Sequence, residues 1–287
     1  MSRNAVTFCN NTALLSDALA DLKDSTQVLF DCEGHDLGMR NPHLHDVLSL
    51  DDTALRPIFD ILESSAVTKV VFDGRMDYSA LYHEFHVEMK NVLDMQLADV
   101  KSRTVRGEGE QQQLQRLCPY LHKREVYGQR ASYLHVHCLN GLAKCAREHD
   151  IPSIGVRPFL KHTRWRERPL PDDHVHYSAH DMAVLRAVHD RFLEKGFIDS
   201  DLKEQSARYI TLCKSSQPKK NHSSFCSPLL PLGIIDYVWS ASSTICSECQ
   251  RNLPTNLFPE SSLRNLKPQP KCWVCRALAT RANLYRS

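Results

Sequence analysis

Two short apolar runs that end near acidic residues constrain the fold of this 287-residue chain most strongly. Residues 28–30 lead directly into Asp31 and Glu33, which are separated by Cys32. Apolar runs of this length predict buried strands. Because side chains at i and i+2 share one face of a strand, Asp31 and Glu33 can hold one cation between them. The same alternation places Cys32 on the opposite face, in the core.

Two more acidic residues stand in helical surroundings. A second short strand, predicted over residues 69–72, leads through a turn to Asp77, where a helical pattern begins. A carboxylate at a helix start is an ordinary cap, and it can also project toward a metal. Tyr177 and Asp181 lie four positions apart in a helix predicted over residues 172–195, so they share a face. Each signal alone has an ordinary structural explanation, and their joint order favours a metal site.

These motifs resemble those of the DEDD 3′-5′ exonucleases of the RNase D and Werner type. The matching stretches are residues 30–34, 69–77, 91–98, 165–170 and 177–181, so the resemblance covers about residues 20–196. It implies an α/β fold in which an RNase H-like mixed sheet is flanked by helices. It also implies hydrolysis of phosphodiester bonds at the 3′ end of single-stranded RNA or DNA, with two Mg²⁺ or Mn²⁺ ions in the active site.

The resemblance also implies a role for each motif residue. Asp31 would touch both metal ions, and Asp77 would help to bind the second one. Glu33 and Asp181 would complete the site of the ion that holds the attacking water, which Tyr177 would orient. His176 lies five residues before Asp181 and fits the histidine variant of the family. Tyrosine is the preferred reading because it follows an Arg-Pro-Leu segment at the spacing of the RNase D branch.

One segment departs from the family pattern. Between Glu33 and the helix predicted over residues 53–63, the fold normally holds two antiparallel strands, but only residues 46–50 look extended. We therefore expect one strand to be missing or shortened, which would leave the first strand less supported. This departure motivates an alternative function, a nucleic-acid-binding module that keeps the carboxylates but cleaves poorly or not at all.

Four cysteines near the C-terminus form a second motif. Cys246 and Cys249 make one CxxC pair, Cys272 and Cys275 make another, and 22 residues separate the pairs. This spacing predicts a tetrahedral Zn²⁺ site, and a closed Cys₄ site is structural rather than catalytic. Trp273 could stack on a base or pack inside the module. Basic residues around the motif permit contact with nucleic acid or with a protein partner: Arg264, Lys267, Lys271, Arg276, Arg281 and Arg286.

Composition limits where nucleic acid could bind. The chain is 42% hydrophobic and 24% charged, and its net charge of +2 is too small for a generally basic surface. Binding of nucleic acid must therefore depend on local basic patches. One candidate patch precedes the third motif. The same residues are explained equally well as part of an ordinary solvated loop. The candidate patch consists of Arg157, Lys161, Arg164, Arg166 and Arg168.

The cysteine content predicts the cellular location of the protein, and stretches typical of loops and linkers predict its domain organisation. Eleven cysteines in a long chain indicate reduced thiols rather than a disulfide framework. No stretch is long and apolar enough to predict a membrane span, and the N-terminus has no signal-peptide core. We expect an intracellular protein, nuclear or cytoplasmic. The expected domains are an exonuclease domain over residues 1–202, a linker over 203–240 and a zinc-binding module over 241–287.

Overall fold

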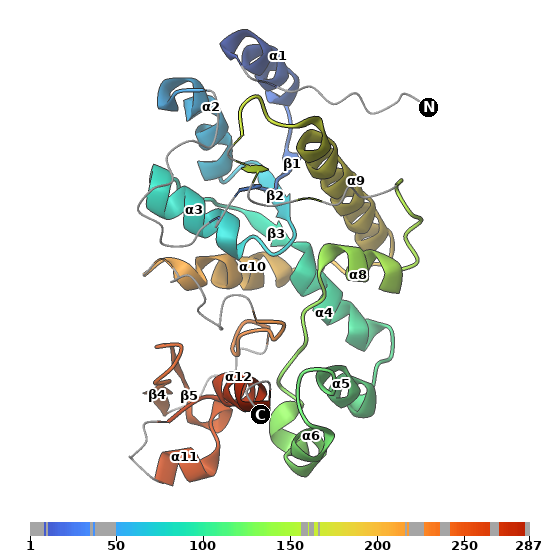
Figure 1. Ribbon diagram of the computed structural model, residues 1–287, viewed down its shortest axis with the longest axis vertical. Coiled ribbons are helices and arrows are strands. Elements are labelled where there is room, and N and C mark those ends of the chain that lie inside the picture. Colours follow the sequence, from blue (N-terminus) through green and yellow to red (C-terminus); the bar gives the residue numbers. More distant parts are fainter. Residues whose placement is uncertain are drawn as a thin grey trace. The chain divides into compact units, whose positions relative to one another are not determined.

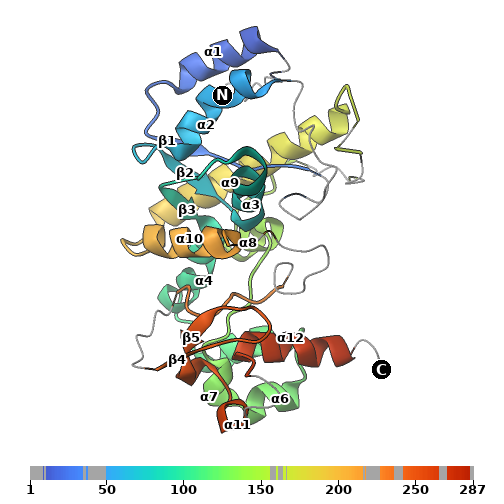
Figure 2. The ribbon, with the colours of Figure 1, turned by 90° about the vertical axis from the view of Figure 1, so that its left-hand side faces the viewer.

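The computed structural model describes residues 9, 11–34, 37, 50–155, 160, 164–165, 167–215, 217, 227–235, 242–264 and 270–284. The chain divides into two compact units. The first unit comprises residues 1–98 and 141–220, and the second comprises residues 99–140 and 221–287. Figures 1 and 2 together label the α-helices and strands of both units.

A small parallel sheet forms the centre of the first unit. Its strands are β1 (Gln27–Leu29), β2 (Thr68–Val71) and β3 (Val92–Asp94), in the order β1-β2-β3. In the register, Val28 lies opposite Lys69, and Val70 lies opposite Leu93. Helices connect successive strands, as parallel pairing requires. The structure thus confirms the predicted α/β fold with a small sheet flanked by helices.

Helices cover both faces of this sheet. Figures 1 and 2 show α2 (Asp52–Glu63) and α3 (Arg75–Phe85) on one face and α9 (Asp172–Glu194) on the other. The described part of the unit also contains α1 (Thr12–Leu22), α8 (Leu142–Glu148), α10 (Leu202–Ile210) and the short η2 (Thr211–Cys213). Helix α4 (Met95–Val105) directly follows β3. No helix in the described part of the chain has the length and apolarity to span a membrane.

The segment that departs from the family pattern lies largely outside the described residues. Of residues 35–49, only Leu37 is described. The extended segment expected at residues 46–50 therefore falls outside the described part except for its last residue. A missing or shortened strand stays a prediction.

Helix α10 corrects the predicted linker, which was expected to begin at residue 203. Its buried side chains include Leu202, Ser206, Tyr209 and Ile210, which recur at helical spacing. The Ser206 hydroxyl accepts a hydrogen bond of 2.9 Å from the backbone N–H of Asp94 at the end of β3. The segment looked like a linker because its exposed face is polar, but its other face belongs to the core of the first unit.

The second unit combines two segments that are distant in sequence. The first segment supplies α5 (Glu110–Leu117), α6 (Lys123–Gly128) and α7 (Arg130–Tyr133). The second supplies the antiparallel strands β4 (Ser243–Ile245) and β5 (Asn252–Pro254), then η3 (Thr255–Leu257), α11 (Glu260–Arg264) and α12 (Trp273–Leu284). Figure 2 shows β4 and β5 beside α12.

One hydrophobic core joins these two segments. Leu114, Val126 and Tyr133 come from the first segment and pack in the same cluster as Leu253 and Trp273 from the second. Backbone hydrogen bonds of 2.7 and 2.8 Å also join residues 137–139 to residues 228–230. The zinc-binding segment is therefore not the independent module expected over residues 241–287, because its apolar side chains complete a core that helices α5 to α7 begin.

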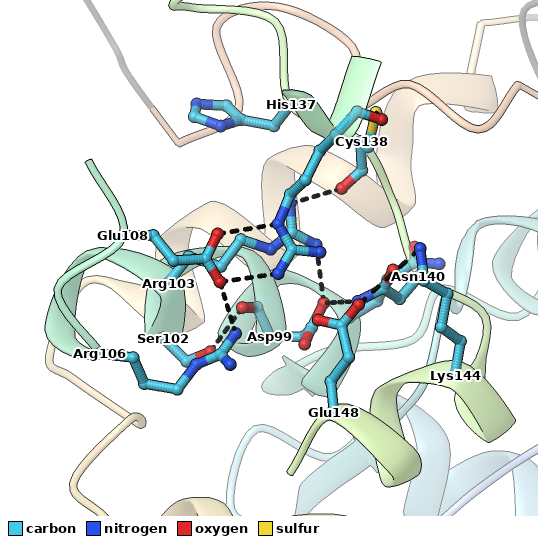
Figure 3. Close-up of polar contacts among 12 residues, drawn as sticks. Asp99, Ser102, Arg103, Arg106, Glu108, His137, Cys138, Asn140, Lys144 and Glu148 are labelled. Atoms are coloured by element: carbon cyan, nitrogen blue, oxygen red, sulfur yellow. Dashed lines mark hydrogen bonds and ion pairs between the residues drawn. The ribbon is translucent and has the colours of Figure 1, made fainter. Parts of the chain in front are cut away.

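A buried ion pair fixes the end of α4 within the second unit (Figure 3). The Asp99 carboxylate accepts hydrogen bonds from Arg103 at 2.9 Å and from the Asn140 amide at 3.0 Å. Arg103 also donates to the Cys138 carbonyl at 2.7 Å. Asp99 and Arg103 are almost completely buried, so each charge depends on the other for the solvation that water no longer supplies.

We predict that Arg103→Met lowers the free energy of unfolding by about 3–5 kcal/mol, because it leaves the Asp99 charge buried without its cation. Arg106→Met is the matched control, since Arg106 pairs with Glu108 at 3.2 Å but keeps 27% of its side chain exposed. The control should cost at most about 1 kcal/mol. Urea denaturation followed by circular dichroism measures both changes, and equal losses would contradict the prediction.

Candidate functional site

Asp31 and Glu33 lie just beyond the end of β1. The strand ends at Leu29, although the Phe30 N–H still donates to the Val70 carbonyl at 2.9 Å. Asp31, Cys32 and Glu33 all line a cavity of about 350 Å³ in the first unit. The prediction that the Cys32 side chain points away from the carboxylates is wrong, because burial and then the charges of Asp77 and Asp31 raise the pKa of its thiol. Strand alternation does not extend to residues 31–33, so it cannot separate their side chains.

The cavity has apolar walls and a few charged or polar groups. Phe59, Leu62, Leu81 and Phe85 line it from helices α2 and α3. Its other lining residues include Glu84, Trp165, Arg168, Leu170, Ser178 and Met182. Concave, largely apolar pockets with a small number of polar groups are typical ligand sites. The presence of Glu84 at this cavity was not predicted, although its position seven residues after Asp77 places both residues on one face of α3.

Asp77 joins the second motif to the first. It lies in the first turn of α3 and is only 5% exposed. Its Oδ1 accepts a hydrogen bond of 2.9 Å from the backbone N–H of Cys32, between Asp31 and Glu33. Burial, and then the negative charge of Asp31, raise the pKa of Asp77 well above its usual range, while the Cys32 N–H acts in the opposite direction. A cation at this position would relieve both the burial and the repulsion.

Helix α9 places Tyr177 and Asp181 on its buried face. Both side chains are 8% exposed, whereas His176 is exposed to solvent. The Tyr177 ring packs beside Trp165, with ring centroids 6.2 Å apart, and Trp165 in turn lines the cavity. The Asp181 carboxylate lies 3.2 Å from Nδ1 of His180. This arrangement favours tyrosine over the histidine alternative, because Tyr177 and Asp181 face inward together.

The cavity brings the α9 motif toward the first motif. Ser178 and Met182, which flank Asp181 on α9, line the same cavity as Asp31 and Glu33. The Gln27 side chain on β1 also lies 3.2 Å from the His189 ring on α9. Among the described residues, however, no three of the four motif carboxylates have ligand oxygens that all lie within 4.8 Å of one another. The metal-binding roles of these residues stay predictions.

The basic patch before the third motif is only partly described. Arg157, Lys161 and Arg166 lie outside the described residues. Arg164 forms an ion pair of 2.9 Å with Glu167, which is typical of a solvated loop. Arg168 donates to the Trp165 and Glu167 carbonyls at 3.0 and 2.8 Å and lines the cavity. Of the two arginines of this patch that the structure describes, Arg168 therefore lies at the candidate site.

The four C-terminal cysteines meet in the second unit. Their Sγ atoms all lie within 4.8 Å of one another; the four residues are Cys246, Cys249, Cys272 and Cys275. The first pair occupies the turn between β4 and β5, and the second lies at the start of α12. Hydrogen bonds from the neighbouring thiols, Cys249 first, lower the pKa of Cys246. Four converging, largely buried thiols fit zinc, since a tetrahedral site takes thiolate ligands.

Trp273 packs inside the second unit. It is buried, and its ring meets the Tyr133 ring edge to face at a centroid distance of 5.6 Å. The Arg276 guanidinium lies 5.4 Å from the Trp273 ring centroid. Base stacking by Trp273 is therefore not supported, and the packed alternative is confirmed. Of the basic residues around the zinc motif, Lys267 and Arg286 lie outside the described residues.

We predict that Asp77→Asn raises the melting temperature by a few degrees at pH 8 without added divalent metal. A carboxyl whose pKa is raised by folding contributes stability below its unfolded pKa, and that contribution is lost as pH rises through the folded pKa. Asparagine removes the penalty and can still accept from Cys32, so the two proteins should converge at low pH. Differential scanning fluorimetry measures the shift.

Asp60→Asn is the control for this experiment, since Asp60 is exposed and pairs with Arg56 at 2.8 Å. This substitution should leave the melting temperature unchanged or slightly lower. A melting temperature of Asp77→Asn at or below that of the wild type at pH 8 would contradict the prediction.

We predict that Cys272→Ser removes the zinc and opens helices α5 to α7 as well as α12. These helices share one core with the cysteines, and structural zinc sites contribute an apparent binding free energy of about 10–16 kcal/mol. Hydrogen exchange should accelerate over residues 110–133, and a metal assay should show zinc loss. Cys118→Ser alters a half-buried thiol in the same unit and should keep both zinc and protection. Unchanged exchange over α5 to α7 in zinc-free Cys272→Ser would refute the shared dependence.

Comparisons with known proteins gave one family match and several similar solved structures. Residues 6–135 match the 3′-5′ exonuclease family. A structure of RNase D from Trypanosoma brucei is 15% identical over 74% of this chain and 73% of that chain, with a TM-score of 0.48. A second, of the same organism's RNase D in complex with RNA U12, is 14% identical over 85% and 82%, with a TM-score of 0.44.

A search of curated proteins gave no match. The family match includes Asp31, Glu33 and Asp77, and it ends before Tyr177 and Asp181. The three earlier motif residues thus lie within the matched region, and the α9 pair is assigned from its own motif. Residues 6–135 of this chain are therefore similar to the 3′-5′ exonuclease family, which agrees with the resemblance of its motifs to those of the DEDD exonucleases.

Proposed function

We propose that the protein is a metal-dependent exonuclease that removes nucleotides from a single-stranded 3′ end by a two-metal mechanism. The observation that carries this proposal is the hydrogen bond between Cys32 N–H and Asp77. It joins two acidic motifs at the cavity that Asp31 and Glu33 line, within the segment that matches the exonuclease family. Substrate would be nucleic acid, either RNA or DNA.

The donor set of the site fits hard divalent ions. Carboxylate oxygens are the ligands that Mg²⁺ and Mn²⁺ prefer. Burial and then the charge of Asp31 raise the pKa of Asp77, so its ionised form is disfavoured unless a cation is bound beside it. We assign Asp31 to both ions, Glu33 and Asp181 to the first, and Asp77 to the second. When bound, such ions make water more acidic and stabilise the charge that develops on the leaving 3′ oxygen.

Side chains of the protein itself would orient the attacking water and exclude bulk water from the cavity. Tyr177 is held against Trp165 on the buried face of α9, so its hydroxyl can orient the attacking water in a fixed direction. The apolar side chains of α2 and α3 line the remaining cavity and lower the local dielectric. Electrostatic interactions with a phosphodiester anion are stronger in such surroundings.

The alternative function is a nucleic-acid-binding module that has lost cleavage. The separation of the motif carboxylates favours it, because no three of them, all within the described residues, approach one another within 4.8 Å. The two functions share substrate binding and differ in turnover. We further infer intracellular residence, on the ground of the many cysteines and of the four that converge as zinc ligands.

We predict Mn²⁺- or Mg²⁺-dependent shortening of a 5′-labelled single-stranded oligonucleotide, one nucleotide at a time from its 3′ end. Asp31→Ala should abolish the ladder, because it removes the ligand assigned to both ions. Tyr177→Phe should slow turnover on the order of 100-fold, as expected for loss of a group that orients the reacting water. His176→Ala should leave the rate close to that of the wild type, since His176 is exposed.

Two other results would assign a different function or subclass to the protein. Oligonucleotide binding by the folded wild type with no ladder under any divalent ion would favour the binding module. A Tyr177→Phe enzyme as fast as the wild type, together with a slow His176→Ala enzyme, would assign the chain to the histidine variant of the family. Gel electrophoresis for cleavage and fluorescence anisotropy for binding separate these cases.

A further inference from the structure

We propose that Asp94 and helix α10 position the Asp77 carboxylate, which makes this buried network a support of the acidic site. The inference rests on the proposed function, since it concerns how the metal ligands are held. Asp94 ends β3 and has no exposed surface. Its Oδ1 accepts from the N–H groups of Asp73 at 3.1 Å and Gln96 at 2.9 Å, and its Oδ2 accepts from Gly74 at 3.0 Å.

The turn that Asp94 holds leads directly into the helix that carries Asp77. Gly74 is the N-cap of α3, and its carbonyl accepts the first helical hydrogen bond, from Tyr78 N–H at 3.0 Å. Asp77 lies three residues after Gly74, in the first turn. The direction in which the Asp77 side chain leaves the helix is therefore set by the path of residues 73–74, which the Asp94 carboxylate fixes through two of its hydrogen bonds.

This turn would not keep its shape unaided. Asp73 has a left-handed backbone conformation, with φ of +59°, which costs a non-glycine residue conformational energy. At Gly74, an added Cβ would lie 2.8 Å from a methyl group of Val71 and 3.5 Å from Ile210 of α10. The chain thus passes between β2 and α10 with no room for a side chain. Such a conformation persists only where surrounding groups hold it.

Side chains of helix α10 also contact the residues around this turn. Besides the Ser206 bond to Asp94 N–H, the Tyr209 hydroxyl donates to the Gln96 side-chain oxygen at 2.7 Å. The Tyr209 ring packs under the Arg75 guanidinium, 4.8 Å from its centre. Arg75 in turn makes two hydrogen bonds to the Asp73 carboxylate, at 2.6 and 2.8 Å. The charged and polar groups of α10 and the turn therefore form one connected network, which is buried except at Asp73, whose side chain is 32% exposed.

Mn²⁺ binding by the zinc-loaded full-length protein, followed by electron paramagnetic resonance, tests the proposal independently of activity. Asp94→Asn keeps the shape of the side chain but turns one acceptor oxygen into an NH₂ group that faces a backbone N–H. We expect Mn²⁺ binding on the order of 10-fold weaker, as for other groups that orient metal ligands. Tyr209→Phe keeps the ring beneath Arg75 and removes only the hydroxyl, so its loss of Mn²⁺ affinity should be smaller.

Tyr133→Phe is the matched control for Tyr209→Phe. Its hydroxyl donates to Glu125 at 3.1 Å in the second unit, so the same atom is removed from another buried tyrosine. It should bind Mn²⁺ as the wild type does. Melting temperatures of all variants show whether a change in affinity accompanies a general loss of stability, and Tyr209→Phe decides the question if Asp94→Asn does not fold.

The outcomes separate this inference from the proposed function. Weaker Mn²⁺ binding by the Asp94 or Tyr209 variant, with a melting temperature like that of Tyr133→Phe, supports positioning. Folded Asp94→Asn and Tyr209→Phe proteins that bind Mn²⁺ like the wild type would overturn it and leave the proposed function intact, because the network would then be structural only. If Asp31→Ala binds Mn²⁺ as the wild type does, the acidic residues are not the metal site and both proposals fail.

Discussion

The hydrogen bond from the Cys32 N–H to the Asp77 carboxylate is the contact on which the candidate site depends. It joins the end of β1 to the start of α3, and these elements come from parts of the chain more than 40 residues apart. A carboxylate as buried as Asp77 loses its hydration, and the backbone donors around it do not replace that hydration, so its pKa rises. Acidic groups held in this way are unfavourable for folding and favourable for cation binding. This trade between stability and function is typical of active sites.

The two units are stabilised by different means. The first buries apolar side chains between a parallel sheet and the helices on its faces, a core of the usual kind for an α/β fold. The second has short elements and a core that contains three of the four clustered cysteines among its buried members. A metal can supply the free energy that so small a core lacks. Since residues 6–135 match the exonuclease family, helices α5 to α7 of the second unit belong to the matched segment.

Most residues of the network proposed to position Asp77 lie outside the acidic motifs. Asp94 is within a stretch that resembles the exonucleases, yet its side chain contacts backbone rather than solvent or cavity. Helix α10 lies beyond the family match, and it carries no acidic residue of the motif. Both elements act on the geometry of a turn. Buried hydrogen bonds of this kind are strong because alternative partners are absent from the interior of a protein.

The sequence by itself determined the features that depend on local spacing. Two apolar runs predicted β1 and β2, the spacing of four placed Tyr177 and Asp181 on one helix face, and two CxxC pairs predicted the cysteine cluster. Only the tertiary structure decided that Cys32 lines the cavity, that α10 packs on β3, and that α5 to α7 share a core with the cysteines. Strand and helix periodicity are properties of neighbouring residues, whereas these contacts join segments far apart along the chain. Such contacts stabilise the protein only when both segments are in place, so no pattern of neighbouring residues predicts them.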